Sequence, residues 1–511
     1  MLKKVFSILK YFFFFLFVLS IPWQKRHIFF NLPIKGEFNE WTAISIYVSD
    51  IFLFLSLIFW AGQLIILKIE KTSKIITPLT PLIRGGDFSP DKPACRSFSV
   101  GRGRARGVSV QIWHNPPPPA SQAKALRAGH PPLSRRGQKI LVTSYQLLAT
   151  LLIIASFSLI QAQYINIAIF RLAKLLEMIL LFTFVVSNFG KLKKRQIIYA
   201  LIIITAFTQG VIAISQYLLQ HSLGLNILGE SPIAANIVGV AKIVVNNEKI
   251  IRAYGTFPHP NVLAGFLILP ILLCFYFWGR LQIWKENNQK TLVKLLLIIS
   301  EIILIISFIL TFSRSAWFVL TLGIIVFIWI NYKKLKPILP GAVILFLTVI
   351  ITIIILWPQI TSRGIIADSS SGDFALSNRT LLNKIALSII ASHPLLGIGI
   401  GNFVLNLNNF IPNMPAWRFQ PVHNLYLYYA AEIGIPGLLI FLSIIWVTLK
   451  KAFKYSKSSN EILILLITLS SFLIIGFLDH YFYDLQQGML IFWLILGLIW
   501  TVILQKYKNI V

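Results

Sequence analysis

Long apolar runs, separated by short polar segments, recur along the whole chain. A helix needs about 20 apolar residues to cross the hydrocarbon core of a bilayer, and the runs have this length. The pattern therefore predicts an all-α, polytopic helical membrane protein with about 12 transmembrane helices. The predicted spans are 5–22, 43–67, 140–161, 164–186, 196–219, 261–279, 292–312, 315–331, 338–357, 425–449, 461–478 and 486–505.

Basic residues gather between these runs, and they predict which side of the membrane each loop faces. Cytoplasmic loops are enriched in Lys and Arg. All but one of the basic clusters fall on one side, namely Lys3/Lys4, Lys191/Lys193/Lys194/Arg195, Arg280/Lys285/Lys290, Lys333/Lys334/Lys336, Lys450/Lys451/Lys454 and Lys506/Lys508, with Lys25/Arg26 as the exception. We expect both termini to be cytoplasmic, and the long connections 220–260 and 358–424 to lie outside and to carry the chemistry.

The same pattern divides the chain into five parts. These are helices 1–2 (1–70), an insertion (71–139), helices 3–9 (140–357), a large outer loop between helices 9 and 10 (358–424), and helices 10–12 (425–511). The insertion holds 13 Lys or Arg against two Asp and is rich in Pro and Gly, so we expect it to be disordered and cytoplasmic. Binding of RNA or anionic lipid by the insertion is the alternative.

Composition and charge add two exclusions. The formal net charge is +30, but Lys and Arg form no continuous basic face, so the expected partner is a lipid bilayer and not nucleic acid. Only two cysteines occur, Cys95 and Cys274, which excludes a disulfide framework and a thiolate metal site.

The outer loop 358–424 contains one predicted helix. Ser377 or Asn378 is the expected N-cap, and Pro394 should end the helix after His393. His393, at the C-terminal end of this helix, is a candidate substrate-binding residue. An apolar stripe along this helix is expected to face the membrane or the helix bundle; its members are Leu381, Leu382, Ile385, Ala386, Ile389 and Ile390.

The pair His423-Asn424 lies where the chain enters the tenth predicted span from outside, and nine residues separate it from Gly434-Ile-Pro-Gly. A histidine at this position is expected to keep a near-neutral pKa and to act as a general base on a hydroxyl, while Asn424 orients the ring or the acceptor. The alternative is a solvated or capping histidine.

Cationic residues on the same predicted side form a second group. Their guanidinium groups suit phosphate oxygens, and the members are Arg252, Arg314, Arg363 and Arg379, with Lys384 nearby in sequence. For Arg363, snorkelling to the membrane interface is the favoured interpretation. Arg314 begins a predicted span, so its alternative role is that of a side chain snorkelling to the membrane interface.

Charged residues within the fourth predicted span repeat every three residues. Arg171, Lys174 and Glu177 should share one helix face that points to the interior. Lys174 and Glu177 can pair, which would leave Arg171 for an anionic ligand; a wholly structural network is the alternative. His259, in Gly255-Thr-Phe-Pro-His-Pro-Asn261, either binds substrate or belongs to a rigid turn.

Two further clusters have weaker interpretations. Gly397, Gly399 and Gly401 lack the spacing of a nucleotide fingerprint, and we expect them to permit close backbone approach. Asp479, His480 and Asp484 could bind a divalent cation. A structural turn is the favoured interpretation, so no metal site is predicted.

Four of these motifs together resemble the O-antigen ligase and O-antigen polymerase superfamily of bacterial envelope enzymes. They are Arg252 with Gly-Thr-Phe-Pro-His-Pro-Asn, Thr311-Phe-Ser-Arg-Ser, His393-Pro-Leu-Leu-Gly-Ile-Gly-Ile-Gly-Asn-Phe, and His423-Asn with the following Gly-Ile-Pro-Gly. The resemblance covers about 140–511, and the 71–139 insertion has no counterpart.

The resemblance implies a glycosyltransferase of the bacterial inner membrane that needs neither a cofactor nor a nucleotide sugar. Its donor would be a glycan on polyprenyl (undecaprenyl) pyrophosphate, and its acceptor a hydroxyl of a glycan or lipid-linked glycan at the periplasmic face. His423 would activate this hydroxyl, and Arg252 and Arg314 would hold the pyrophosphate. A second base or acid is not apparent in the outer loops.

Two other functions fit the same resemblance. One is a protein O-oligosaccharyltransferase, and the other is a transporter, since members of the superfamily have been linked to bicarbonate uptake. Secondary transporters are built from inverted repeats, and the sequence shows no clear repeat. The gathering of His and Arg outside the membrane favours transfer chemistry, and the acceptor pocket cannot be identified from the sequence.

Overall fold

A computed structural model of the chain describes residues 2–76, 135–282, 285–364 and 369–508. Contacts divide the chain into two compact units, Met1–Gln63 with Leu133–Val511 and, between these segments, Leu64–Pro132. Most of the predicted insertion 71–139, together with the disorder expected for it, lies outside the described residues. The first unit contains the features described below.

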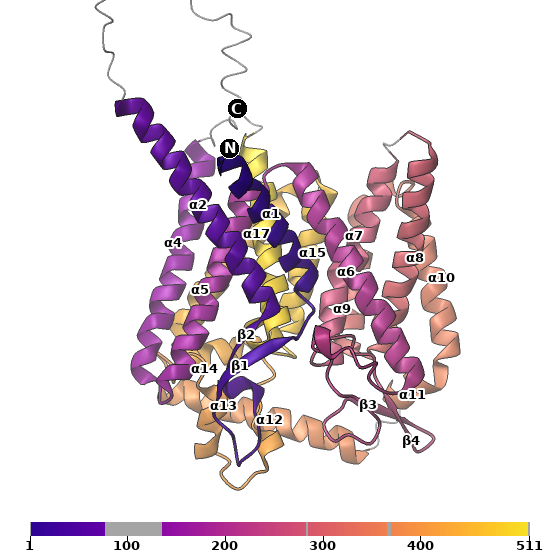
Figure 1. Ribbon diagram of the computed structural model, residues 1–511. Coiled ribbons are helices and arrows are strands. Elements are labelled where there is room, and N and C mark those ends of the chain that lie inside the picture. Colours follow the sequence, from indigo (N-terminus) through magenta and orange to yellow (C-terminus); the bar gives the residue numbers. More distant parts are fainter. Residues whose placement is uncertain (1, 77–134, 283–284, 365–368, 509–511) are drawn as a thin grey trace, which may run out of the picture. The chain divides into compact units, whose positions relative to one another are not determined.

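Each of the twelve predicted spans coincides with a helix (Figure 1). In chain order these helices are α1 (Leu2–Ser20), α2 (Val48–Ile76), α4 (Arg135–Ser158), α5 (Ile165–Asn188), α6 (Leu192–Leu219), α7 (Pro260–Leu281), α8 (Asn288–Leu310), α9 (Arg314–Asn331), α10 (Leu339–Ile355), α14 (Leu425–Ser456), α15 (Asn460–Ile475) and α17 (Gln486–Lys508). The prediction of a polytopic helical membrane protein is confirmed.

The twelve helices differ in how well each suits a bilayer. Within the described residues, eight helices are long and apolar enough to cross a membrane by length and composition alone. Helices α10 and α15 are apolar but have only 17 and 16 residues. Helices α1 and α5 each carry three charged residues. In α5 these residues are Arg171, Lys174 and Glu177.

Helices α7 and α17 occupy the interior of the bundle. In their most apolar stretches 89% and 100% of the residues are buried, against 22% for α2. A helix that is apolar on every side is stable only when other helices surround it, and both sequences have this character. Helix α17 contacts α5, α14 and α15, and α7 contacts α6, α8 and α15.

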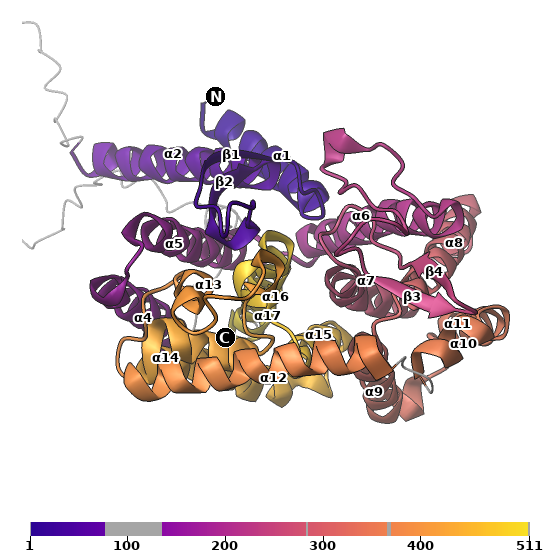
Figure 2. The same cartoon turned by 90° about the horizontal axis from the view of Figure 1, so that it is seen from below.

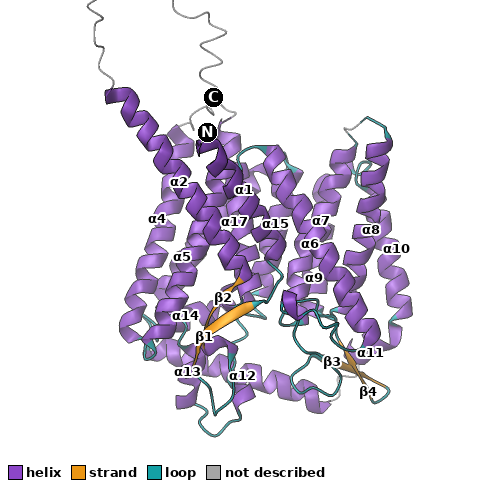
Figure 3. Ribbon diagram, in the orientation of Figure 1, coloured by secondary structure: helices purple, strands orange, loops and turns teal. Residues whose placement is uncertain are grey.

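Two short antiparallel hairpins, which the sequence analysis did not predict, lie at one end of the bundle (Figure 3). Strands β1 (Arg26–Asn31) and β2 (Ala43–Tyr47) pair with each other, and the 3₁₀ helix η1 (Glu40–Thr42) precedes β2. Strands β3 (Lys242–Val245) and β4 (Glu248–Ile251) form the second hairpin. Both chain termini lie at the opposite end (Figure 1).

The long connection 358–424 lies at the hairpin end and contains α11 (Trp357–Gly364), α12 (Ser369–Ser392) and α13 (Phe403–Asn406). The predicted N-cap at 377–378 is wrong, because α12 begins at Ser369. The apolar stripe of α12 packs against the protein. It belongs to a cluster that is separate from the main core and includes Leu382, Ile389, Phe403, Phe419 and Tyr428. Helix α12 contacts α14 and runs across its near end when the bundle is viewed from this side (Figure 2).

A kink in α14 explains the Gly-Ile-Pro-Gly motif. Gly434 has φ +76°, a left-handed conformation that favours glycine. Pro436 has no amide hydrogen, so the helix cannot satisfy the carbonyl of Glu432 in the usual way. The carbonyls of Ala431 and Glu432 instead accept hydrogen bonds of 3.0 Å from the amides of residues 398–399. The kink therefore holds the glycine-rich segment against α14.

Candidate active site

The candidate site lies where the first turns of α7, α9 and α14 meet the short connection between α15 and α17. This connection carries Asp479, His480 and the four-residue helix α16 (Tyr481–Asp484). His423 precedes the first turn of α14, and its ring lies 5.1 Å from the His480 ring, measured between centroids and at an angle of 88°. Two histidines distant in sequence thus form the centre of the site, and the partner of His423 was not predicted.

His480 is held by carboxylates on both sides. Its Nδ1 lies 2.8 Å from both carboxylate oxygens of Asp484, and its amide donates a 2.9 Å hydrogen bond to Asp479 Oδ1. All three side chains are buried. The sequence analysis had grouped these residues only as a turn or a metal site. Among the described residues, no group of three or more His, Cys, Asp or Glu is arranged to hold a metal ion.

The surroundings shift the pKa values of the two histidines in opposite directions. Burial lowers the pKa of His480, but Asp484 and Asp479 raise it more, so that the net shift is upward. Burial, and then the neighbouring His480, lower the pKa of His423 to about 4. The near-neutral pKa expected for His423 is therefore wrong, because the ring is buried beside a second histidine. At neutral pH His423 is uncharged, and its buried Nδ1 has no hydrogen-bond partner among the described residues.

Asp479 connects this pair to the arginines. Burial raises the pKa of Asp479, but His480, His423 and Arg379 lower it more, so the carboxylate is ionised at neutral pH. Its Oδ2 accepts a 3.2 Å hydrogen bond from Asn261 Nδ2. Asp479 thus links the histidine pair to α7.

Arg252 is buried, and it contacts the same asparagine, Asn261, that bonds to Asp479. Its Nη2 donates a 2.8 Å hydrogen bond to Asn261 Oδ1, and its Nε donates one of 2.6 Å to the carbonyl of Thr311. These bonds join the Gly-Thr-Phe-Pro-His-Pro-Asn motif to the Thr-Phe-Ser-Arg-Ser turn, two of the motifs found in the sequence. Arg252 is positioned to orient Asn261 and the turn that leads to Arg314.

Arg314 and Arg379 line one cavity of about 340 Å³ together with Asn261 and Asp479; we call it the arginine pocket. Arg314 is the first residue of α9, and the residue two positions before it, Phe312, has φ +48°. This unfavourable conformation persists because the Phe312 ring is fully buried. Two guanidinium groups that line one cavity have the chemistry to bind phosphate oxygens.

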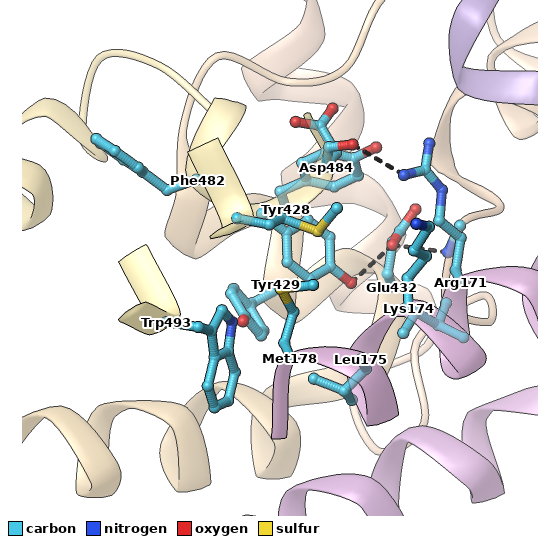
Figure 4. A pocket seen from close by; sticks show the side chains of 14 residues that line it. Arg171, Lys174, Leu175, Met178, Tyr428, Tyr429, Glu432, Phe482, Asp484 and Trp493 are labelled. Atoms are coloured by element: carbon cyan, nitrogen blue, oxygen red, sulfur yellow. Dashed lines mark hydrogen bonds between the residues drawn. The ribbon is translucent and has the colours of Figure 1, made fainter. Parts of the chain in front are cut away.

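Arg171, Lys174 and Glu177 do face the interior, as predicted. Lys174 Nζ lies 3.1 Å from Glu177 Oε2 and also pairs with Asp50, a partner that the sequence analysis missed. Arg171 donates a 2.9 Å hydrogen bond to the carbonyl of Asp484 (Figure 4). It therefore supports the residue that holds His480.

Glu432 anchors the glycine-rich segment, and it lines a cavity separate from the arginine pocket together with Arg171, Lys174 and Asp484 (Figure 4). Its carboxylate accepts hydrogen bonds from the amides of Gly401 (2.7 Å) and Phe403 (3.1 Å) and from the Tyr483 hydroxyl (2.8 Å). A side chain at Gly401 would collide with Arg171. The close backbone approach predicted for the glycines is confirmed.

Three predicted residues have mainly local roles. Asn424 is the N-cap of α14, since its Oδ1 accepts 3.0 Å hydrogen bonds from two amides of the first turn. His259 caps α7 through a 3.1 Å hydrogen bond from the Asn261 amide, and it lies close enough to lower the pKa of Asp479. His393 is exposed, its Nδ1 lies 2.9 Å from Ser392 Oγ, and no described contact joins it to His423.

A comparison with known families agrees with the resemblance noted in the sequence. Residues 299–442 match a family model described as O-antigen ligase. The matched segment contains Arg314, Arg379 and His423, while Arg252 and His480 lie outside it. No curated protein matches the chain.

Proposed function

We propose that the chain, whose residues 299–442 match the O-antigen ligase family, transfers a glycan from a polyprenyl-pyrophosphate-linked donor to a hydroxyl acceptor. The observation that supports this proposal most directly is the position of His423. It is uncharged at neutral pH and interacts electrostatically with both Asp479 and Arg379, two residues that line the arginine pocket. A hydroxyl nucleophile requires a base, and a pyrophosphate leaving group requires positive charge on its oxygens.

In the proposed reaction, His423 takes the proton of the acceptor hydroxyl as the hydroxyl oxygen attacks the anomeric carbon of the donor. A bond forms between this oxygen and carbon, and the bond from the carbon to the pyrophosphate oxygen breaks. The bonding electron pair leaves with polyprenyl pyrophosphate. Arg314 and Arg379 stabilise the negative charge that develops on the leaving group.

The remaining residues position this machinery. Asp484 and Asp479 orient His480 beside His423. Burial, and then the charge that the two carboxylates favour on His480, keep His423 free of a proton. Arg252 and Asn261 hold the Arg314 turn and Asp479 together. Each of these groups acts through its neighbour and not on the substrate.

We place the reaction at the periplasmic face of the bacterial inner membrane. The site lies at the hairpin end, and the loops that carry the basic clusters lie at the end that holds both termini (Figure 1). Positive loops remain in the cytoplasm, which supports a periplasmic site. Lipid-linked donors can reach it from the outer leaflet.

The test uses the purified protein in lipid nanodiscs with lipid-linked glycan. We expect His423→Ala to lower the turnover about 10²- to 10⁴-fold, the usual contribution of a general base, without weakening donor binding. His393→Ala is the matched control, because His393 is exposed at the same end of the bundle, and it should transfer at the wild-type rate. Near-normal turnover of His423→Ala would refute the assignment.

A further inference from the structure

A second cavity lies between the β1–β2 hairpin and the segment that follows α13. Its volume is about 330 Å³, and we call it the hairpin pocket. We infer that the hairpin pocket is an acceptor subsite that binds an uncharged sugar ring of the acceptor glycan. This inference rests on the proposed glycan transfer, and it adds the location and chemical class of the acceptor.

Hydrogen bonds fasten the two walls of the pocket to each other. Asn39 Nδ2 donates a 3.1 Å hydrogen bond to the carbonyl of Phe419, and Lys35 donates one to the carbonyl of Pro412. Asn39 Oδ1 also accepts a 3.0 Å hydrogen bond from the amide of Trp41. The pocket is therefore largely formed before a ligand arrives, as is usual for small-molecule sites.

The lining of the pocket suits a sugar ring. Phe38, Trp41, Trp417 and Phe419 all line it, and Phe38 and Trp417 remain 53% and 49% exposed. Large exposed apolar groups gathered at one pocket indicate a binding site. A sugar ring has a face of C–H groups that packs against an aromatic ring, whose faces carry partial negative charge.

Polar groups at the same pocket can recognise hydroxyls. Glu37, Glu40 and Gln420 line it alongside the aromatic residues. Carboxylates accept hydrogen bonds from hydroxyl groups, and the carboxamide can both donate and accept. A few polar groups among aromatic walls are the usual composition of a site that orients a neutral ligand.

Charge separates the two pockets at this end of the bundle. The arginine pocket has two guanidinium groups, whereas the described residues that line the hairpin pocket include two carboxylates and neither Lys nor Arg. Glu40 is paired with Arg26 at 3.9 Å, whereas Glu37 is exposed and would repel an anionic sugar or a phosphate. The leaving group and the acceptor are thereby directed to different pockets.

Trp41 connects the hairpin pocket to the histidine pair. Its ring lies 6.1 Å from the His480 ring, which lies 5.1 Å from the His423 ring. Trp41 Nε1 is buried without a hydrogen-bond partner among the described residues. Such an unsatisfied donor is rare unless water or a ligand binds nearby. An acceptor glycan held in the hairpin pocket thus extends past Trp41 toward His423.

The test measures transfer to a glycan released from its lipid by mild acid, which can act only as acceptor because it lacks pyrophosphate. We expect Trp417→Ala and Phe38→Ala to raise the KM for this acceptor about 2- to 10-fold, the loss expected from one aromatic contact. The kcat and the KM for the lipid-linked donor should stay within about twofold of the wild type, since neither residue lines the arginine pocket. Phe29→Ala is the matched control, because Phe29 is exposed on the same hairpin but does not line the pocket.

An unchanged acceptor KM in both variants, or a raised donor KM, would overturn the inference. Absence of transfer by the wild-type protein would instead refute the proposed function. Saturation-transfer NMR of the released glycan with the protein in nanodiscs tests the subsite in either case. A weaker saturation-transfer signal on the glycan with Trp417→Ala than with the wild-type protein supports the subsite. Equal signals from the two proteins refute it.

Discussion

The rings of His423 and His480 lie 5.1 Å apart and nearly perpendicular, although their residue numbers differ by 57. Asp484 holds His480 from the other side at 2.8 Å. His480 therefore raises the cost of protonating His423, and this relationship makes the pH dependence of transfer a direct test of the site.

The acid limb of the pH profile should report His423. The pKa of His423 is lowered to about 4, first by burial and then by His480, so the base is lost only as the pH falls toward 4. His480→Gln removes the neighbouring positive charge, which should raise the pKa of His423 and move the acid limb of kcat/KM to higher pH. His393→Gln should leave the limb in place. A limb that stays fixed or moves to lower pH in His480→Gln would contradict this electrostatic coupling.

Arg314→Lys should weaken both donor binding and leaving-group stabilisation. Lysine keeps the charge but lacks the planar group that binds two phosphate oxygens at once. We expect kcat/KM for the lipid-linked donor to fall about 10-fold or more, as for loss of a charged hydrogen bond worth about 1.5–3 kcal/mol. Lys384→Ala is the control, because Lys384 is exposed on α12 but does not line the arginine pocket. Assays with EDTA should match those without it; rescue by a divalent cation would show that the site needs a metal.

Gly401→Ala should destabilise the protein. Gly401 has φ +78°, and a Cβ at this position would collide with Arg171. The strained conformation alone costs about 1–3 kcal/mol. Gly224→Ala separates the two effects, because Gly224 has φ +80° but no atom within 4 Å of the added Cβ. Thermal unfolding in detergent should give a lower Tm for Gly401→Ala than for Gly224→Ala, and equal values would show that the contact with Arg171 is unimportant.

Cysteine labelling in intact cells should establish the orientation. We expect Asn408→Cys, at an exposed position in the long connection before α14, to react with a membrane-impermeant maleimide from the periplasm. Ser458→Cys, in the exposed loop between α14 and α15, should react only after the membrane is permeabilised. Both variants are made in a chain with Cys95 and Cys274 replaced by serine. The opposite labelling pattern would place the site in the cytoplasm.

The sequence by itself determined the twelve helices and which loops lie together. Apolar length and the spacing of basic clusters are local properties, so a pattern along the chain is enough to read them. It also selected His423, Arg252 and Arg314 as candidates, because each belongs to a motif that leads into a helix or begins one. The two interior helices, α7 and α17, could be recognised only after packing, since lipid and protein neighbours favour the same apolar side chains.

Only the tertiary structure decided which candidate residues lie together and in what environment. His423 and His480, and likewise Lys174 and Asp50, are in contact although they come from distant segments, and Trp41 and Trp417 line the same pocket. No spacing in the sequence encodes these arrangements. Burial beside His480 shifted the pKa of His423 away from the near-neutral value expected for a loop histidine. Asn424 is a helix cap because the residues that follow it form the first turn of α14. His393 is exposed and lies just after the end of α12. Chemistry at a site depends on distance and dielectric environment, and the fold sets both.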